Sequence, residues 1–281
     1  MLLVIDVGNT NTVLGVYEGD GLVAHWRLVT AHQQTVDEYG ILARNLLALA
    51  GLDAGKIDGV IISSVVPQLD GTLADMVGRY FKLAPLFVEP GIKTGIRVHY
   101  DNPQEVGADR IANAVAAYEK YGGPAIIVDF GTAITFDALS DKGDYLGGVI
   151  TPGLGIASDA LFQRAARLPR VALAEPEKLI GTNTVGSIQS GLFYGSLAMV
   201  DGVLDRLKAE LGANARVIAT GGQASLLAGA SRHIELVDEF LTLDGLRLLY
   251  ARNPDVHPAS FGGTRPAKPA ASAKKPSKRR R

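Results

Sequence analysis

Two short stretches of the sequence combine an aspartate, a glycine and small polar side chains in the same order. They are Asp6-Val7-Gly8-Asn9-Thr10-Asn11-Thr12 and Asp129-Phe130-Gly131-Thr132-Ala133. A glycine two residues after an aspartate allows a tight turn and leaves room for a phosphate group. The hydroxyls, amides and backbone N–H groups that follow are neutral donors for phosphoryl oxygens, and the aspartate can orient a hydrated Mg²⁺ ion. One such turn is common for structural reasons alone, but two predict a pair of phosphate-binding turns.

Two other glycine-rich segments lie at the ends of predicted strands, at residues 147–153 and 219–222. Both could bring the backbone close to an adenine and ribose, or could be no more than tight turns between a strand and a helix. Two familiar nucleotide-binding patterns are excluded. Residues 51–57 lack one spacer of a P-loop and end in Ile57, and residues 153–158 have Ser158 in place of the third glycine of the dinucleotide fingerprint.

Strands and helices alternate around these turns, and the pattern begins again in the second half of the chain. Apolar runs predict strands at residues 2–5, 13–17, 23–29, 60–62, 96–100, 125–128, 134–139, 145–151 and 217–219. Helical periodicity, with a capping box at Thr35 and Glu38, predicts helices at residues 35–50, 71–81, 106–121, 156–166, 187–211 and 245–252. Each half therefore opens with a strand that ends in an Asp-X-Gly turn, which predicts a duplicated α/β fold.

The composition is that of a globular protein with a substantial core. Of the 281 residues, 47% are hydrophobic and 20% are charged, and the formal net charge of −1 provides no global field to attract nucleic acid or acidic membranes. The absence of cysteine excludes disulfides, thiolate catalysis and cysteine-based metal sites. The apolar run at the N-terminus is short and has no basic region before it, so we expect neither a signal peptide nor a membrane span. We therefore expect a cytoplasmic protein.

The composition changes once, near residue 253. Beyond it proline, alanine, serine, lysine and arginine dominate, and such a segment cannot bury enough apolar surface to offset the entropy lost on ordering. We expect an N-terminal domain at residues 1–120, a C-terminal domain of the same type at residues 121–253, and a disordered basic tail at residues 254–281. The tail could be a solubilising extension or an arm for nucleic acid or another anionic surface.

The paired turns and the glycine-rich segments together resemble those of the acetate and sugar kinase/Hsp70/actin superfamily. Four segments of the sequence narrow the resemblance to the type III pantothenate kinases. The four are residues 6–12, Gly107-Ala108-Asp109-Arg110, residues 128–133 and residues 147–153. The resemblance runs from Met1 to about residue 252, and only the basic tail departs from it. It implies two actin-like (ribonuclease H-like) domains, each a mixed β-sheet flanked by helices, with a cleft between them. The implied reaction is the ATP-dependent phosphorylation of pantothenate to 4′-phosphopantothenate, the first step of coenzyme A biosynthesis.

The same resemblance implies cofactors, partners and roles for individual residues. Members of the family act as homodimers that bind pantothenate near the subunit interface, and they need ATP with a divalent ion such as Mg²⁺ and a monovalent cation, K⁺ or NH4⁺. The ATP-binding positions correspond to Asp6, Val7, Gly8, Asn9, Thr10, Asn11, Thr12, Val13 and Thr132, with Asp6 acting through Mg²⁺. The pantothenate-binding positions correspond to Tyr100, Gly107, Ala108, Asp109, Arg110 and Thr184, and Asp129 corresponds to the site of the monovalent cation.

Several of these residues have a structural alternative. Asp109 lies where a loop meets a helix, which suits a carboxylate serving the helix dipole as well as a general base in a cleft. The resemblance favours the base, which would orient the primary hydroxyl of pantothenate. Asp129 could instead cap the turn that follows it, Tyr100 could be an ordinary aromatic at a strand end, and Thr184 could be the N-cap of the next helix.

Two other functions compete with pantothenate phosphorylation. An ATP-binding actin-like chain with a basic tail could be a non-enzymatic regulator that acts through partners or nucleic acid. A kinase or phosphohydrolase of the same superfamily could act on another small molecule. The paired turns together with Asp109 favour catalysis, because a regulator needs no general base.

Overall fold

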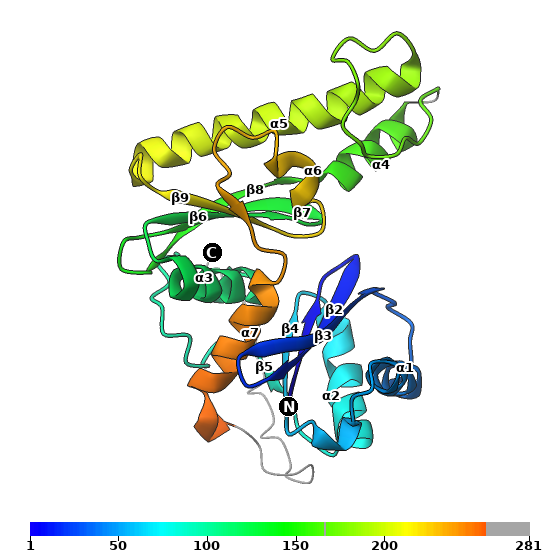
Figure 1. Ribbon diagram of the computed structural model, residues 1–281, viewed down its shortest axis with the longest axis vertical. Helices are drawn as coiled ribbons and strands as arrows, with labels where there is room; N and C mark the ends of the chain where they lie inside the picture. Colours follow the sequence, from blue (N-terminus) through cyan, green and yellow to red (C-terminus); the bar gives the residue numbers. More distant parts are fainter. Residues whose placement is uncertain (166, 257–281) are drawn as a thin grey trace, which may run out of the picture.

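The computed structural model of the protein contains two five-stranded sheets of the same design (Figure 1). It describes residues 1–165 and 167–256. The strand order is β3-β2-β1-β4-β5 in the first sheet and β10-β9-β6-β7-β8 in the second. In each sheet the opening strand pairs antiparallel with the next strand on one side and parallel with a later strand on the other. The predicted duplicated actin-like fold, with two mixed sheets flanked by helices, is confirmed.

The first sheet has two helices packed on one face. Its strands are β1 (Leu2–Val7), β2 (Asn11–Glu18), β3 (Gly21–Val29), β4 (Gly59–Ser64) and β5 (Leu86–Phe87), and the helices are α1 (Val36–Leu49) and α2 (Pro67–Phe81). Leu47 of α1 and Leu73 of α2 pack against Leu3 and Ile5 of β1. The predicted capping box opens α1, because the Thr35 side chain accepts from the Glu38 backbone N–H while the Glu38 side chain accepts from the Thr35 backbone N–H.

The second sheet is covered on its outer face by helices that lie between its strands in the chain. Its strands are β6 (Ala125–Phe130), β7 (Ala133–Leu139), β8 (Tyr145–Pro152), β9 (Arg216–Thr220) and β10 (Leu236–Val237), and the helices are α4 (Leu154–Arg164), α5 (Thr184–Leu211) and α6 (Ala224–Ala228). Phe193 and Val200 of α5 pack against Val128 and Phe136. Helix α5 is 28 residues long and extends beyond the sheet, with α4 beside its projecting end (Figure 1).

Helices α3 (Ala108–Tyr121) and α7 (Leu241–Arg252) join the two halves. Ile111 of α3 packs against Ile127 of the second sheet, whereas Val115 of α3 and Leu246 of α7 share a core with Val4 of the first sheet. Helix α7, the last α-helix of the described residues, therefore returns to the first sheet. The strands of the two sheets lie on either side of residue 120, but the domain boundary there stays a prediction, since α3 and α7 pack across it.

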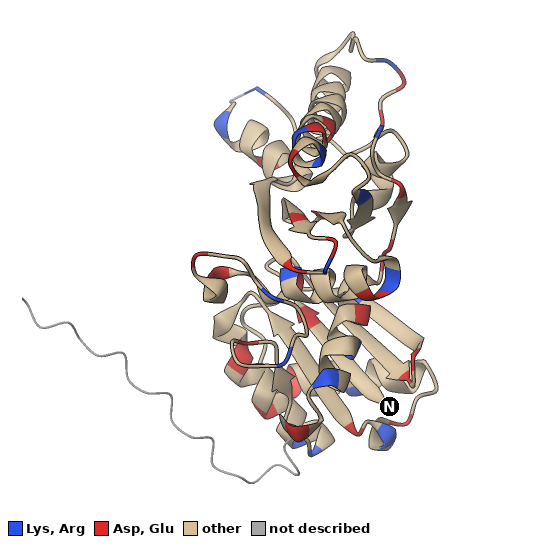
Figure 2. Cartoon of the chain, turned by 90° about the vertical axis from the view of Figure 1, so that its left-hand side faces the viewer, with Lys and Arg blue, Asp and Glu red and all other residues tan. Residues whose placement is uncertain are grey.

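The surface of the described residues carries charges of both signs. In Figure 2, basic and acidic residues are interspersed over both halves of the chain, in keeping with the formal net charge of −1. Within the described part of the chain, no helix has the length and apolar character that a membrane crossing requires. A separate group of charged residues lines a cavity between the halves, where the ends of β1 and β6 approach the start of α3.

Some sequence-based expectations differ from the structure. The strand predicted at residues 96–100 is wrong, because only Val98 forms a bridge, with Tyr145. Strands β5 and β10 were not predicted, since two residues are too few to show a period of two. Of the predicted basic tail, Pro254–Val256 form a short 3-10 helix, and residues 257–281 lie outside the described residues.

Candidate active site

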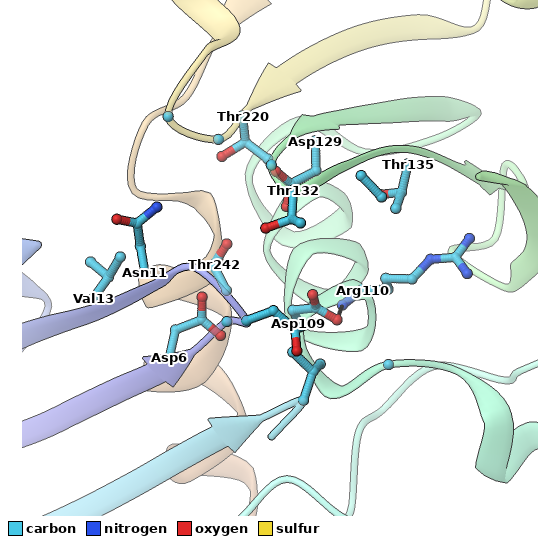
Figure 3. Close-up of a pocket in the computed structure, with 18 of the residues that line it drawn as sticks. Asp6, Asn11, Val13, Asp109, Arg110, Asp129, Thr132, Thr135, Thr220 and Thr242 are labelled. Carbon is cyan, nitrogen blue, oxygen red and sulfur yellow. Dashed lines mark hydrogen bonds between the residues drawn. The ribbon is translucent and has the colours of Figure 1, made fainter. Parts of the chain in front are cut away.

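One cavity lies between the two sheets, where the carboxyl ends of β1 and β6 face each other (Figure 3). Its volume is about 340 Å³, and both halves of the chain line it. Asp6 and Asn11 come from the first half, and Asp129, Thr132 and Thr220 come from the second. Ligands of open α/β sheets bind outside the carboxyl ends of strands, so the cavity lies where the fold favours a site.

The two Asp-X-Gly turns meet across this cavity. The hydroxyl oxygens of Thr10 and Thr132 lie 2.8 Å apart, within hydrogen-bond distance. Each turn is closed by its glycine, because the Gly8 N–H donates to the Asn11 carbonyl at 2.9 Å and the Gly131 N–H donates to the Ala133 carbonyl at 3.0 Å. The pair of turns predicted from the sequence is therefore brought together by the fold.

Three aspartates also line the cavity: Asp6 at the end of β1, Asp109 in the first turn of α3 and Asp129 near the end of β6. Burial, with a further contribution from the negative charge of Asp109, raises the pKa of Asp6 and of Asp129 to about 7. Burial also raises the pKa of Asp109. Neighbouring carboxyl groups that do not readily ionise at the same time form a site suited to binding a cation or transferring a proton.

A buried amide fixes the orientation of Asp129. The Asn113 side chain on α3 donates to Oδ2 of Asp129 at 3.0 Å and accepts from the Thr242 hydroxyl at 2.7 Å. Asn113 is 0% exposed, so its polar atoms need these partners. Thr242 lies in the first turn of α7 and lines the cavity. Both helices that join the halves therefore hold this carboxylate in place.

Asp109 is held by its own helix. Its Oδ1 accepts a hydrogen bond from the Arg110 backbone N–H at 2.8 Å. A methyl group at Gly107, the N-cap position, would lie 2.5 Å from the same oxygen, so a larger residue there would require this carboxylate to shift. The negative charge lies at the helix N-terminus and also borders the cavity, so both readings of Asp109 from the sequence fit the structure.

The guanidinium of Arg110 turns away from the three aspartates (Figure 3). Its Nε donates to Oδ1 of Asp137 at 2.7 Å, and the Tyr145 hydroxyl donates to the same oxygen at 2.7 Å. Asp137 is fully buried and Arg110 is 7% exposed. The charge of Arg110 is thus paired within the protein.

Comparison with known proteins assigns a family. The family model described as type III pantothenate kinase matches residues 2–206. The chain is 60% identical over 263 residues to the type III pantothenate kinase of Koribacter versatilis, covering 90% of this chain and 96% of that protein. It is 58% identical over 253 residues to the enzyme of the same name from Myxococcus xanthus, covering 90% and 99%. The chain belongs to the type III pantothenate kinase family.

Two solved structures share the fold at low sequence identity. A Campylobacter jejuni protein named for the Baf family of transcriptional activators has a TM-score of 0.57 and 21% identity, covering 90% of this chain and 100% of that one. The ethanolamine utilization protein EutJ of Carboxydothermus hydrogenoformans has a TM-score of 0.54 and 13% identity, covering 88% and 89%. Similarities this distant show the fold alone. The family resemblance seen in the sequence motifs is confirmed by the closer relatives.

Most of the site residues predicted for this pantothenate kinase family member lie around the one cavity. They are Asp6, Gly8, Asn9, Thr10, Asn11, Val13, Gly107, Asp109, Arg110, Asp129 and Thr132. Val7 and Thr12 point elsewhere: Val7 packs in the first core, and the Thr12 hydroxyl pairs with that of Thr30 at 2.9 Å. Ala108, Tyr100 and Thr184 do not line the cavity either.

Tyr100 and Thr184 lie apart from the three aspartates. The ring of Tyr100 packs 6.4 Å from that of Tyr145, in a segment that is not a strand. Thr184 is exposed and lines a second, more open cavity of about 790 Å³ along α4 and α5. The expectation that it might serve as an N-cap is wrong, because Asn183 caps α5 by accepting from the Gly186 N–H at 2.8 Å.

Several residues of the cavity were not predicted. Thr220 and Gly221 belong to a glycine-rich segment whose role the sequence left open, whereas Arg27 and Thr242 were missed. The sequence analysis also missed Asn113, which does not line the cavity but donates to Asp129. Asn113 did leave a signal, since it is the polar residue in an otherwise apolar stretch of α3. Arg27 and Thr242 reach the cavity only through the pairing of distant elements.

Proposed function

We propose that this protein uses ATP to phosphorylate pantothenate, giving 4′-phosphopantothenate and ADP, the first step of coenzyme A biosynthesis. The names of its relatives support the substrate. The observation that carries the chemistry is the 2.8 Å contact of Thr10 with Thr132 in the cavity that Asp109 also lines. A triphosphate held between the two turns would lie beside a carboxylate that can accept a proton, and phosphoryl transfer depends mainly on such positioning.

In this proposal Asp109 is the general base. The primary hydroxyl of pantothenate donates a hydrogen bond to the Asp109 carboxylate, which aims its oxygen at the γ-phosphorus. As the new oxygen–phosphorus bond forms, the hydroxyl proton passes to Asp109, and the bond from the γ-phosphorus to the oxygen that bridges to the β-phosphate breaks, releasing ADP. Burial raises the pKa of Asp109, which makes its carboxylate a stronger base than an exposed aspartate.

Asp6 and Asp129 fit a role in holding cations. Their carboxylate oxygens suit Mg²⁺ and K⁺, and a bound cation would offset the repulsion from Asp109 that contributes to their raised pKa values. Among the described residues no three acidic, histidine or cysteine side chains are grouped to hold a metal by themselves. We assign Mg²⁺ to Asp6 together with ATP, and the monovalent cation, K⁺ or NH4⁺, to Asp129. The cations would neutralise phosphate charge.

The pantothenate site would be completed in a homodimer. Gly107, Ala108 and Arg110 lie at or next to the proposed base, whereas Thr184 lies along the second cavity. The family resemblance implies that pantothenate binds near a subunit interface, and Thr184 would then contribute to a site formed by two subunits. Tyr100 would close the same site, and the enzyme would act in the cytoplasm.

The direct test is turnover with a panel of alcohols. The protein is incubated with ATP, Mg²⁺ and K⁺, and ADP release is measured with pantothenate and with small sugars, glycerol and other primary alcohols. We expect ADP release with pantothenate to exceed that with each other alcohol, and to need the monovalent cation. Equal or greater turnover with another alcohol would assign a different substrate, and no turnover with any would support the regulatory alternative.

A further inference from the structure

Strand β3 brings to the cavity an arginine that no motif indicated. Across the paired strands β1, β2 and β3, Asp6 lies opposite Val13, and Val13 lies opposite Arg27. Residues directly opposite one another in antiparallel strands project from the same face. The three therefore form a row on the face toward the second half, and all three line the cavity. The neighbours Trp26 and Leu28 pack into the core on the other face.

Arg27 is a cation without an acidic partner among the described residues. Arg110, the other arginine of the cavity, is paired with Asp137 at 2.7 Å. The Arg27 side chain is exposed and makes no ion pair with any residue of 1–165 or 167–256. A methyl group placed on Gly222 would lie 3.2 Å from its Nη1, so the guanidinium spans from the first sheet to the loop after β9.

The other charges around the cavity are mostly negative. Its acidic lining residues are Asp6, Glu105, Asp109, Asp129 and Glu239. Burial and then the charge of Asp109 raise the pKa of both Asp6 and Asp129, and Arg27 partly opposes that shift in each. The positive charge of Arg27 therefore acts on the aspartates of both phosphate-binding turns, Asp6 and Asp129. A guanidinium at this position would lower the repulsion between the carboxylates and an entering polyphosphate, in addition to the charge that bound cations supply.

We propose that Arg27 binds the β- and γ-phosphates of ATP, bridging the two turns from the edge of the first sheet. A guanidinium offers a planar fork of donors that matches two phosphate oxygens at once. Because Arg27 belongs to the first half and reaches the second, the same contact links triphosphate binding to the approach of the two halves. This inference rests on the proposed use of ATP but not on the identity of the alcohol.

The test measures nucleotide binding in the absence of any alcohol. Arg27→Gln should weaken binding of Mg-ATP by roughly 10- to 100-fold, because a hydrogen-bonding charge is lost. The affinity for AMP, which lacks both phosphates concerned, should stay the same. Arg27→Lys keeps the charge without the fork and should fall between the parent and the glutamine variant. Titration calorimetry gives the ATP affinity, and displacement by AMP gives the second value.

Arg79→Gln is the matched control, since it removes an arginine of α2 that pairs with Asp37 on the surface of the same half. It should leave both affinities unchanged. Unchanged ATP affinity in Arg27→Gln would overturn the inference, and so would equal losses for ATP and AMP, which would place Arg27 against the nucleoside or in the support of the fold. ATP binding that depends on Arg27, without turnover of pantothenate, would retain the inference and reject the proposed substrate.

Discussion

Asp109 combines two properties in one side chain: its carboxylate borders the cavity, and its Oδ1 is fixed by the Arg110 backbone N–H. Asp109→Asn keeps the shape and an oxygen for that hydrogen bond but removes the proton acceptor. We expect kcat to fall roughly 10²- to 10⁴-fold while the affinity for ATP stays near that of the parent. Steady-state kinetics and ATP titration measure the two effects.

The control for this variant is Asp141→Asn, which changes an exposed aspartate in the turn between β7 and β8. It should leave kcat unaltered. Near-normal turnover in Asp109→Asn would remove Asp109 from the mechanism and leave it the role of a helix-terminal carboxylate.

Asp6 and Asp129 also make the stability of the ligand-free protein depend on pH. Each has a pKa raised from 3.8 to about 7, so the folded state binds more protons than the unfolded state between these two values. The free energy of unfolding contributed by these groups is therefore highest at low pH and falls as pH rises through about 7. Asp6→Asn and Asp129→Asn should each show a smaller drop in unfolding temperature between pH 5.5 and pH 8 than the parent.

Thermal unfolding across that pH range, without nucleotide and at constant ionic strength, measures the effect. A drop in the two variants as large as that of the parent would show that other groups set the pH dependence. Asp141→Asn serves again as the control, because its carboxyl group is exposed.

At the scale of elements, α3 and α7 are packed closely enough to require a glycine. A methyl group on Gly245 of α7 would overlap the carbonyl of Ala112 on α3. Gly245→Ala should therefore force the helices apart and lower the free energy of unfolding by roughly 1–3 kcal/mol. Denaturant unfolding of the parent and the variant measures the difference.

Gly71→Ala is the matched control within helix α2, where no atom lies within 4 Å of the added methyl group. It should leave stability unchanged or raise it by about 0.4–1 kcal/mol, because alanine restricts the unfolded chain. Equal stability of Gly245→Ala and the parent would show that the helices adjust without cost.

Local patterns were sufficient to predict most elements but not their partners. The capping box at Thr35 and the apolar runs of β1 and β6 depend on neighbours in sequence, and the structure contains them. The segment around Val98 alternates apolar and polar residues without being a strand, because it packs beside β8 through one bridge. The return of α7 to the first sheet depends on contacts between residues far apart in the chain, which periodicity does not record.

At the scale of the whole molecule, the site consists of contributions from both halves. The motif residues Thr10 and Thr132 could be predicted because the same turn occurs twice, and the fold sets them 2.8 Å apart. Arg27 could not, since its place depends on the register of three strands, and Thr242 could not, since it depends on the docking of α7. Duplication thus left a signal in the sequence, whereas the contacts between the copies did not.

Near the C-terminal end of the described residues, Asn253 anchors the chain to the fold just before the basic segment begins. Asn253 is 0% exposed, and its side chain accepts from the Lys93 N–H at 2.8 Å and donates to the carbonyls of Lys93 at 2.9 Å and Leu249 at 2.8 Å. A chain that ends at Val256 keeps all three hydrogen bonds. A chain that ends at Arg252 loses them and leaves these backbone groups, of which the Leu249 carbonyl is buried, without the Asn253 side chain as partner.

We therefore expect two deletions to differ sharply. Removing residues 257–281 should leave both the unfolding temperature and the turnover of pantothenate unchanged, because Asn253 still fixes α7 against the segment at Lys93. Removing residues 253–281 should lower the free energy of unfolding by roughly 1–3 kcal/mol. Kinetics and thermal unfolding of both truncated chains decide the matter. Loss of turnover in the shorter deletion, at an unchanged unfolding temperature, would contradict this expectation and give the basic segment a direct part in the kinase reaction.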